Sequence, residues 1–301
     1  MKEFSFMRYR WLYFAISAVV IIPGLISLVI NGVRPSIDFT GGSLLEVRYV
    51  QSDPPIAIER ESIQEVVGDE VEIISVQTSG SNQAILRMPS ITNEQKDAIL
   101  DQLDDPLTTV EQLRFETVGP VLGKELFQKT LLAVVIVSIG ITLYVWRQFH
   151  SAKYGVSAIL AMFHDSIVLI GLFSLFGRFL GAEVDVLFVT ALLTTLSFSV
   201  HDTIVVFDRI RENQRKHPTL QFTTVVDASI LETLSRSINN SMTIIIMLLV
   251  LVLLGGDTIR WFSVALLVGA VTGTYSSTFI AAPLVVVWDN WQKRQKKKLA
   301  T

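Results

Sequence analysis

The polar residues of this sequence that could do chemistry lie inside long apolar stretches. Asp202, preceded by His201, belongs to one such stretch, and Arg236 opens another. An ionisable side chain at membrane depth costs roughly 2.5 to 3.5 kcal/mol, so its presence indicates a function. Burial disfavours the charge of a carboxylate and a nearby arginine favours it, so such a group can load and release a proton. Arginine keeps its own proton, and its expected role is to set the field at Asp202 and to pair with it in turn.

Helical spacing gathers these residues on two polar faces. Positions 195, 199 and 202 share one face, with Phe198 as its apolar member. A second face follows the i, i+3, i+4, i+7 pattern of a helix. Its members are Arg236, Asn239, Asn240 and Thr243. We expect the two helices to face each other through these residues and to form an ion path. The alternative is a static ion pair that fixes helix register.

A second His-Asp pair, His164 and Asp165, lies near the middle of another apolar stretch and forms, with Ser199, a set of secondary intramembrane polar positions. A metal site is not expected, because no carboxylate or histidine at i+3 or i+4 completes a ligand set and no H-E-x-x-H occurs. The absence of cysteine excludes disulfides, thiolate metal sites and cysteine nucleophiles. No G-x-S-x-G is present, which disfavours an intramembrane hydrolase. We therefore expect no cofactor and no enzymatic activity.

Composition predicts a polytopic membrane protein built of α-helices. Half of the 301 residues are apolar and 18% are charged, and the mean hydropathy is +0.49. A membrane-spanning helix needs about 20 mostly apolar residues. Six stretches between charged residues meet this requirement. The six predicted transmembrane helices cover residues 11–33, 126–146, 154–177, 184–206, 235–254 and 261–288.

The distribution of Lys and Arg predicts the orientation of these helices. Basic residues precede the first span, follow the second and fourth, and fill the tail at 289–301. Because cytoplasmic loops carry the excess of Lys and Arg, we expect residues 1–10 and the tail to lie in the cytoplasm. The first span is interpreted as an uncleaved anchor, and the tail as a contact for membrane lipids. A nucleic-acid partner is not expected.

Residues 34–125 are predicted to form a small extracytoplasmic domain with 17 acidic and 7 basic residues. Alternating runs predict strands, and amphipathic runs predict helices, in the order β-α-β-β-α-β, which is the ferredoxin-like α+β arrangement. The strands are Leu44 to Val50, Val71 to Thr78, Ala84 to Met88 and Thr109 to Thr117, and the helices are Ile56 to Val67 and Thr92 to Leu103. Thr92 and Gln95 predict a capping box.

Asp38, Gly41 and Gly42 precede the first predicted strand and form a structural motif, in which the glycines allow the backbone to bend. At the other end of the membrane region, Asp208, Arg209, Arg211 and Glu212 are interpreted as a helix end in water, with a proton-exit gate as the alternative.

Four stretches of sequence resemble one known family. They read S-I-D-F-T-G-G-S-L-L from Ser36, F-E-T-V-G-P-V-L-G-K-E-L from Phe115, S-V-H-D-T-I-V-V-F-D-R-I-R-E-N from Ser199 and S-R-S-I-N-N-S from Ser235. These stretches resemble the SecF subunits of the SecD/SecF family, which belong to the bacterial Sec protein-export machinery. The resemblance covers essentially the whole chain, including the layout of six spans with one outside domain.

The resemblance implies an RND-like half bundle in the bacterial inner membrane, partnered by SecD. It implies that the chain acts beside the SecYEG channel, with YajC and YidC as further partners, and uses the proton motive force to complete the export of preproteins. The family's membrane-embedded Asp and Arg fall on Asp202 and Arg236. His201 stands where many relatives have Asn, and either joins the path or only hydrogen-bonds across helices. The alternative is half of an RND-type exporter of small molecules or lipids, which should have larger outside domains.

Overall fold

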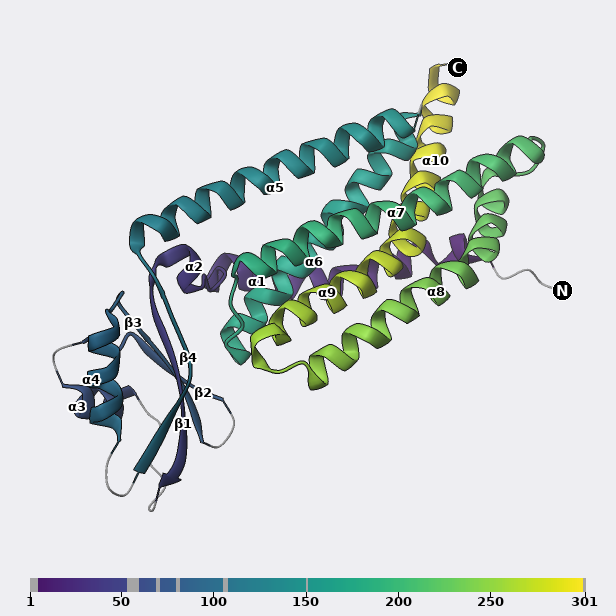
Figure 1. Ribbon diagram of the computed structural model, residues 1–301. Coiled ribbons are helices and arrows are strands. Elements are labelled where there is room, and N and C mark those ends of the chain that lie inside the picture. The colour runs from purple at the N-terminus through teal and green to yellow at the C-terminus, as the bar shows by residue number, and fades with distance from the viewer. Residues whose placement is uncertain are drawn as a thin grey trace. The chain divides into compact units, whose positions relative to one another are not determined.

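The computed structural model describes residues 5–52, 60–68, 71–79, 82–104, 108–149 and 151–299. The chain divides into two compact units (Figure 1). One unit, here called the helical unit, consists of the residues up to 34 and those from 133 onward, and the other, the sheet unit, covers residues 35–132.

Six helices among the described residues are long and apolar enough to cross a membrane. Five lie in the helical unit, and the other, α5 (Pro120–Gln148), begins in the sheet unit and continues into the helical unit. The last of the six along the chain includes a π-helical turn, η2, between two α-helical parts. The elements are η1 (Phe6–Tyr9), α1 (Arg10–Asn31), α5 (Pro120–Gln148), α6 (Ala152–Leu180), α7 (Val186–Lys216), α8 (Phe222–Leu254), α9 (Asp257–Ser276), η2 (Ser277–Ala281) and α10 (Ala282–Leu299).

Several helices extend beyond the apolar stretches that predict them. The stretch 184–206 starts two residues before α7, which begins at Val186 and continues to Lys216, and the stretch 235–254 is only the second part of α8. The predicted basic tail is helical as far as Leu299. Charged residues end an apolar stretch without ending a helix, because pairs three or four residues apart support a solvated helix. On α7, Glu212 pairs with both Arg209 and Lys216.

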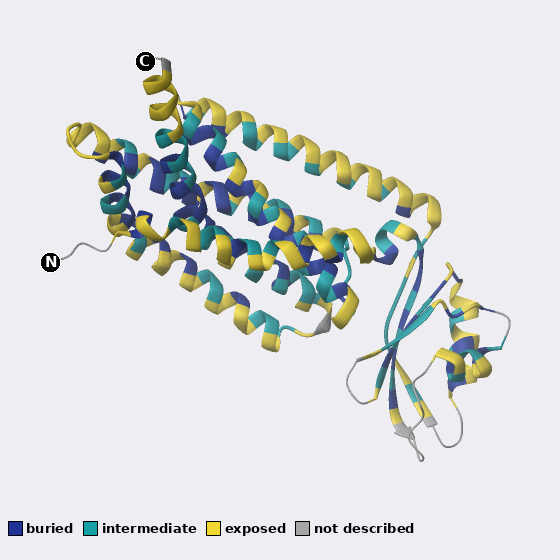
Figure 2. Ribbon diagram, turned by 180° about the vertical axis from the view of Figure 1, so that it is seen from behind, coloured by how far each residue is buried: buried dark blue, intermediate teal, exposed yellow. Residues whose placement is uncertain are grey.

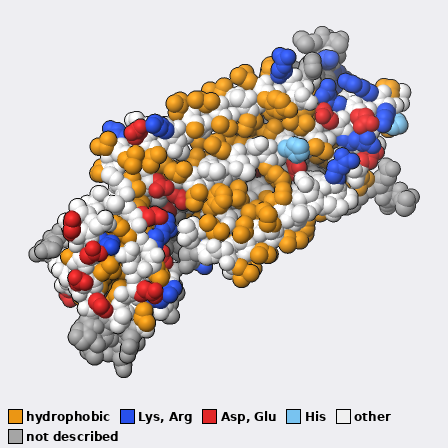
Figure 3. Space-filling view, viewed as in Figure 1, with side chains coloured by type: hydrophobic (Ala, Val, Ile, Leu, Met, Phe, Trp, Pro, Cys, Tyr) orange, Lys and Arg blue, Asp and Glu red, His pale blue; other side chains and the backbone are white. Residues whose placement is uncertain are grey.

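Apolar side chains cover the outside of the helical unit, while its interior combines apolar and small polar groups. Figure 2 shows buried residues on α6 and α7, whereas α5 is exposed along most of its length. Figure 3 shows hydrophobic side chains over the outer face of the helices and basic ones gathered at the end that holds the α7–α8 turn and the end of α10. Such an apolar exterior is what a lipid environment requires.

Helices α1 and α6 approach each other closely where Gly24 meets Gly171. A Cβ atom on Gly24 would lie 3.0 Å from the Cα of Gly171. Small residues allow this kind of backbone contact between membrane helices. Ser27 and Ser174 form a 2.8 Å hydrogen bond at the same interface. The two helices are therefore held together by close packing and by hydroxyl contacts.

The sheet unit confirms the predicted ferredoxin-like order. Its four strands form an antiparallel sheet in the order β2-β3-β1-β4. Leu45 of β1 pairs with Leu86 of β3 and Phe115 of β4, and these residues belong to the core beneath the two helices. The elements are α2 (Ile37–Thr40), β1 (Gly42–Ser52), α3 (Arg60–Val67), β2 (Ser75–Ser79), β3 (Gln83–Met88), α4 (Asn93–Leu103) and β4 (Thr108–Val118).

Two details of the sheet unit bear on the predicted boundaries. The capping box of Thr92 and Gln95 is present at the start of α4. The strand predicted from Val71 begins instead at Ser75, because the Gln64 side chain bonds the backbone of the preceding segment. It donates to the Val71 carbonyl and accepts from the Ile73 N–H at 2.7 Å. Residues 56–59 of the helix predicted from Ile56 lie outside the described residues.

The glycines at the start of β1 have a steric reason. Gly41 and Gly42 have φ angles of 73° and 122°, which L residues with a side chain rarely adopt. A Cβ atom would lie 2.8 Å from the Cα of Pro120 at the first glycine and 2.9 Å from the carbonyl oxygen of Met88 at the second. Just before them, the Ser36 hydroxyl accepts a hydrogen bond from the Asp38 N–H. This turn leads directly into β1.

Candidate functional site

Asp202 lies midway along α7 on its buried face and is 6% exposed. Its Oδ2 atom accepts a hydrogen bond of 3.1 Å from the Ser237 hydroxyl of α8. The nearby hydroxyls of Ser199 and Thr203 are buried and have no hydrogen-bond partner among the described residues. Buried polar groups are normally satisfied. The surroundings of Asp202 are therefore polar, with hydrogen-bonding capacity that the chain itself does not use.

The predicted second polar face does not meet Asp202. The side chains of Arg236, Asn239, Asn240 and Thr243 are exposed on the outside of α8. No ion pair joins Arg236 to Asp202 in the part of the chain that the structure describes, so the prediction that the two polar faces oppose each other is wrong for this chain. Helix α8 has a second polar face, and packing in this chain turns that face toward the interior.

The inward face of α8 carries hydroxyl groups at every fourth position. All four are buried, and Ser237 is the one that reaches Asp202. These residues are Ser229, Thr233, Ser237 and Ser241. Their spacing is visible in the sequence as a regular hydroxyl stripe, which is the signal that could have identified the face turned toward α7.

His201 is exposed, although Asp202 beside it is buried. Successive residues of a helix point about 100° apart, so neighbours can face different environments. His201 and Arg236 are thus both on the surface of this chain, on neighbouring helices that pack together.

His164 and Asp165 are brought together with two serines from other helices. Asp165 is fully buried, and its Oδ1 atom lies 2.9 Å from Nδ1 of His164. Its Oδ2 atom accepts a 2.6 Å hydrogen bond from Ser276 at the end of α9. Nε2 of His164 is hydrogen-bonded to the Ser17 hydroxyl of α1. The serines were not identified from the sequence, because a single serine in an apolar stretch carries no local signal.

Two polar centres are thus present, one around Asp202 and one around Asp165, and helix α9 lies beside both. Ser276 contacts Asp165, and Thr274 donates a 2.6 Å hydrogen bond to Ser241 on α8. Gly273 lies against Phe198 and Ser199 of α7. No group of three or more His, Asp or Glu side chains suited to a metal ion occurs in the described ranges.

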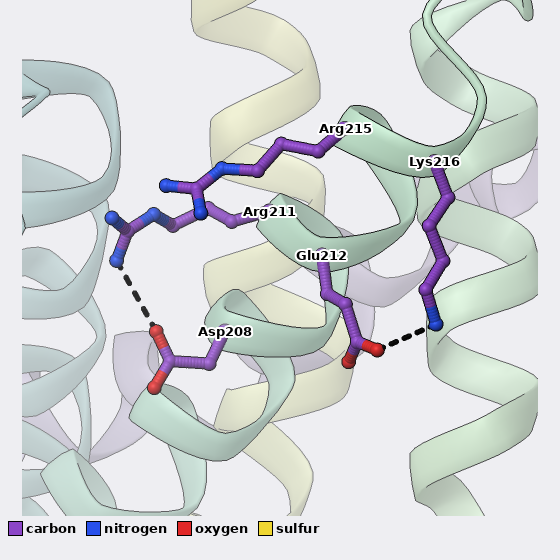
Figure 4. Close-up of a pocket in the computed structure, with 5 residues that line it drawn as sticks. All are labelled: Asp208, Arg211, Glu212, Arg215 and Lys216. Atoms are coloured by element: carbon purple, nitrogen blue, oxygen red, sulfur yellow. Dashed lines mark hydrogen bonds and ion pairs between the residues drawn. The ribbon is translucent and has the colours of Figure 1, made fainter.

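A shallow pocket of about 400 Å³ lies at the end of α7 (Figure 4). Arg211 donates to Asp208 at 3.3 Å, and Lys216 donates to Glu212 at 2.7 Å. The pocket also includes Arg215, which runs beside Arg211 in Figure 4. Exposed pairs at this spacing contribute little to stability. The arrangement fits the interpretation of a helix end in water.

The sequence and the structure both match proteins of one family. The model of the C-terminal region of the protein export membrane protein SecD/SecF matches residues 98–291, and the SecD/SecF GG motif matches residues 26–53. Protein translocase subunit SecF of Anaerolinea thermophila is 44% identical over an alignment of 299 positions, which covers 96% of this chain and 96% of its own. The corresponding subunit of Thermobaculum terrenum is 42% identical and covers 94% of this chain and 93% of its own.

A solved structure agrees with these relatives. The crystal structure of SecDF, a translocon-associated membrane protein from Thermus thermophilus, matches with a TM-score of 0.81 and 34% identity. The match covers 96% of this chain and 39% of the SecDF chain. The six apolar helices and these relatives identify a multi-pass membrane protein, and the family model, the SecF relatives and the SecDF fold place the chain in the SecD/SecF family of protein export membrane proteins.

Proposed function

We propose that this chain is an auxiliary subunit of the Sec preprotein translocase that works with SecD and uses the proton motive force to complete protein export. The relatives named SecF and SecDF are protein translocase subunits. SecDF relatives, of which this chain covers 36% and 39%, indicate SecD as the partner. The single observation that supports proton coupling is the buried Asp202 in a membrane-spanning helix.

Asp202 is suited to bind and release a proton because no charged partner on the described helices neutralises it and hydroxyls near it have hydrogen-bonding capacity to spare. Among the described residues its carboxylate accepts one hydrogen bond, from a neutral hydroxyl, and two hydroxyls on the same helix have no partner there. In such a place the charged form of a carboxylate has a high free energy, whereas the protonated form is tolerated. One charge that crosses the membrane potential yields about 2.3 kcal/mol per 100 mV. That energy is sufficient to bias a conformational equilibrium.

The exposed polar face of α8 is proposed to meet SecD. An arginine and two amides facing lipid would be costly, so a protein surface has to cover them. SecDF supplies such a surface within one chain, since this chain matches 39% of it. Arg236 would then lie at the interface with SecD and set the electric field along the proton path. Asn239, Asn240, Thr243 and His201 would lie along the same interface.

Orientation and further partners belong to the same proposal. Basic side chains gather at one end of the helical unit (Figure 3), which by the positive-inside rule faces the cytoplasm of a bacterial inner membrane. Residues 34–125 would then lie outside, between the span 11–33 and the region 126–288. SecYEG, YajC, YidC and preproteins are the proposed partners, and no enzymatic activity is proposed. The alternative of half an RND-type exporter is not favoured, because the relatives are translocase subunits.

The proposal is tested by preprotein release into proton-loaded inverted vesicles that contain SecYEG, SecD and this chain. Asp202→Asn should abolish the stimulation that the wild-type chain gives, and an uncoupler should do the same. Asp208→Asn is the matched control, since Asp208 lies on the same helix but is exposed. Stimulation that survives both the uncoupler and Asp202→Asn would show that the chain is a scaffold.

A further inference from the structure

A continuous series of hydrogen bonds crosses the interior of the helical unit, and Asp202 is not part of it. It runs from Ser17 on α1 through His164 and Asp165 on α6 to Ser276 on α9. Both ring nitrogens of the histidine and both carboxylate oxygens have partners. Asp165 is 0% exposed and the His164 side chain is 11% exposed. A fully satisfied set of this kind holds its members in fixed positions.

The charge of the His-Asp pair depends on a single proton. With a neutral ring and an ionised carboxylate the pair carries one negative charge, and no Lys or Arg side chain forms an ion pair with Asp165 in the described part of the chain. A lone buried charge is unfavourable, whereas one added proton makes the pair neutral overall.

Within the described ranges, no other ionisable side chain forms a hydrogen bond or an ion pair with His164 or Asp165. Tyr275 donates its hydroxyl to the Tyr13 carbonyl at 2.8 Å, one turn before Ser17. Lys153 at the start of α6 pairs with Asp289 of α10 at 2.9 Å. On α7, His201 is exposed and Asp202 bonds Ser237. The charged end of α7 lies beyond Phe207, which packs on Tyr154 near the start of α6.

We propose that His164 and Asp165 form a second proton-binding site, separate from Asp202, whose loading reverses the hydrogen bond to Ser17. The carboxylate only accepts hydrogen bonds, so Nδ1 of the ring carries a hydrogen. In the unloaded state Nε2 accepts from the Ser17 hydroxyl. A hydronium ion transfers a proton to Nε2: one O–H bond breaks, one N–H bond forms and a water molecule is left. Nε2 then donates to the Ser17 oxygen, and the hydrogen of the Ser17 hydroxyl turns away from the ring.

The consequence is confined to one of the contacts between α1 and α6. Ser27 with Ser174 and Gly24 with Gly171 hold the same two helices together without a titratable group. Only the contact through Ser17 changes with the proton. The inference stands on the geometry of the helical unit and does not depend on export activity, so it can fail while the proposed function holds, and the reverse.

The test is a pH titration of the full chain, labelled with ¹⁵N-histidine, in lipid vesicles and followed by solid-state NMR. The chain has four histidines, and His164→Gln identifies the signal of interest. Between about pH 4 and pH 9, that ring should pass from the neutral form with hydrogen on Nδ1 to the doubly protonated form. Asp165→Asn removes the carboxylate that accepts the hydrogen bond from Nδ1, and the signal of that ring should change.

Two serine variants separate the site from general packing. Ser17→Ala removes the partner of Nε2 and should change how the Nε2 signal of His164 responds to pH, whereas Ser27→Ala removes a hydroxyl from the same interface and should leave that response unchanged. A His164 signal that keeps one form across the range overturns the proposal, as does equal behaviour of the two serine variants. If Asp165→Asn does not fold, the comparison of the serine variants still decides.

Discussion

The helical unit contains the same dipeptide twice, and the two copies have opposite surroundings. His164 and Asp165 on α6 bond to each other and to serines of two further helices. His201 on α7 is exposed, and Asp202 receives one hydrogen bond while hydroxyls near it have none among the described residues. One dipeptide is saturated and the other retains free capacity. The comparison teaches that partners on other helices, and not the dipeptide, decide what a buried carboxylate can do.

The largest expected effect concerns the exposed arginine that the sequence pairs with the second dipeptide. Arg236→Met should abolish the stimulation of export in vesicles that also contain SecD, because the field of the proton path is lost. It should leave the free energy of unfolding of the isolated chain nearly unchanged, since Arg236 is exposed there. Export and unfolding are measured on the same preparation.

Arg236→Lys is the control for this prediction, because it keeps the charge but not the planar donor set. Partial stimulation is expected from it. Full stimulation with Arg236→Met would show that Arg236 has no part in the proposed proton path.

Removal of the Asp165 carboxylate should lower the free energy of unfolding more than removal of the Asp202 carboxylate. Asp165→Ala deprives His164 and Ser276 of a partner, and we expect a loss of about 3 kcal/mol in the free energy of unfolding, as for a broken buried pair. Asp202→Ala removes one hydrogen bond and should cost about 1 kcal/mol. Reversible unfolding in mixed micelles measures both. Equal losses would show that the two carboxylates have the same structural role.

Much of this architecture could be predicted from local patterns, because apolar length, strand alternation and capping act over a few residues. The helix ends were missed where charged pairs such as Glu212 with Lys216 extend a helix into water. The inward face of α8 could not be chosen, since two polar faces compete and only packing decides between them. Ser17 and His164 meet across 147 residues of sequence, a distance over which no periodicity carries information.

The histidines should differ in the same sense as the carboxylates. His164→Gln loses bonds to Ser17 and Asp165, and a loss of about 2 kcal/mol in the free energy of unfolding is expected for a hydrogen bond to a charged group. His201→Gln alters an exposed position and should stay within about 0.5 kcal/mol. The same unfolding measurement applies. A large loss at His201 would mean that this ring has a partner that its exposure does not reveal.

The smallest expected effects are those of the two serines that donate to the carboxylates. Ser276→Ala removes a 2.6 Å hydrogen bond to a fully buried oxygen, and the free energy of unfolding should fall by about 1.5 kcal/mol. Ser237→Ala removes a 3.1 Å bond to Asp202 and should cost about 0.5 kcal/mol, because unused hydroxyls nearby can replace it. Asp202 would then keep its capacity for a proton, and export should continue. If Ser237→Ala proved the more damaging of the two, the saturated centre would be the one that tolerates change, and the roles of the two dipeptides would have to be exchanged.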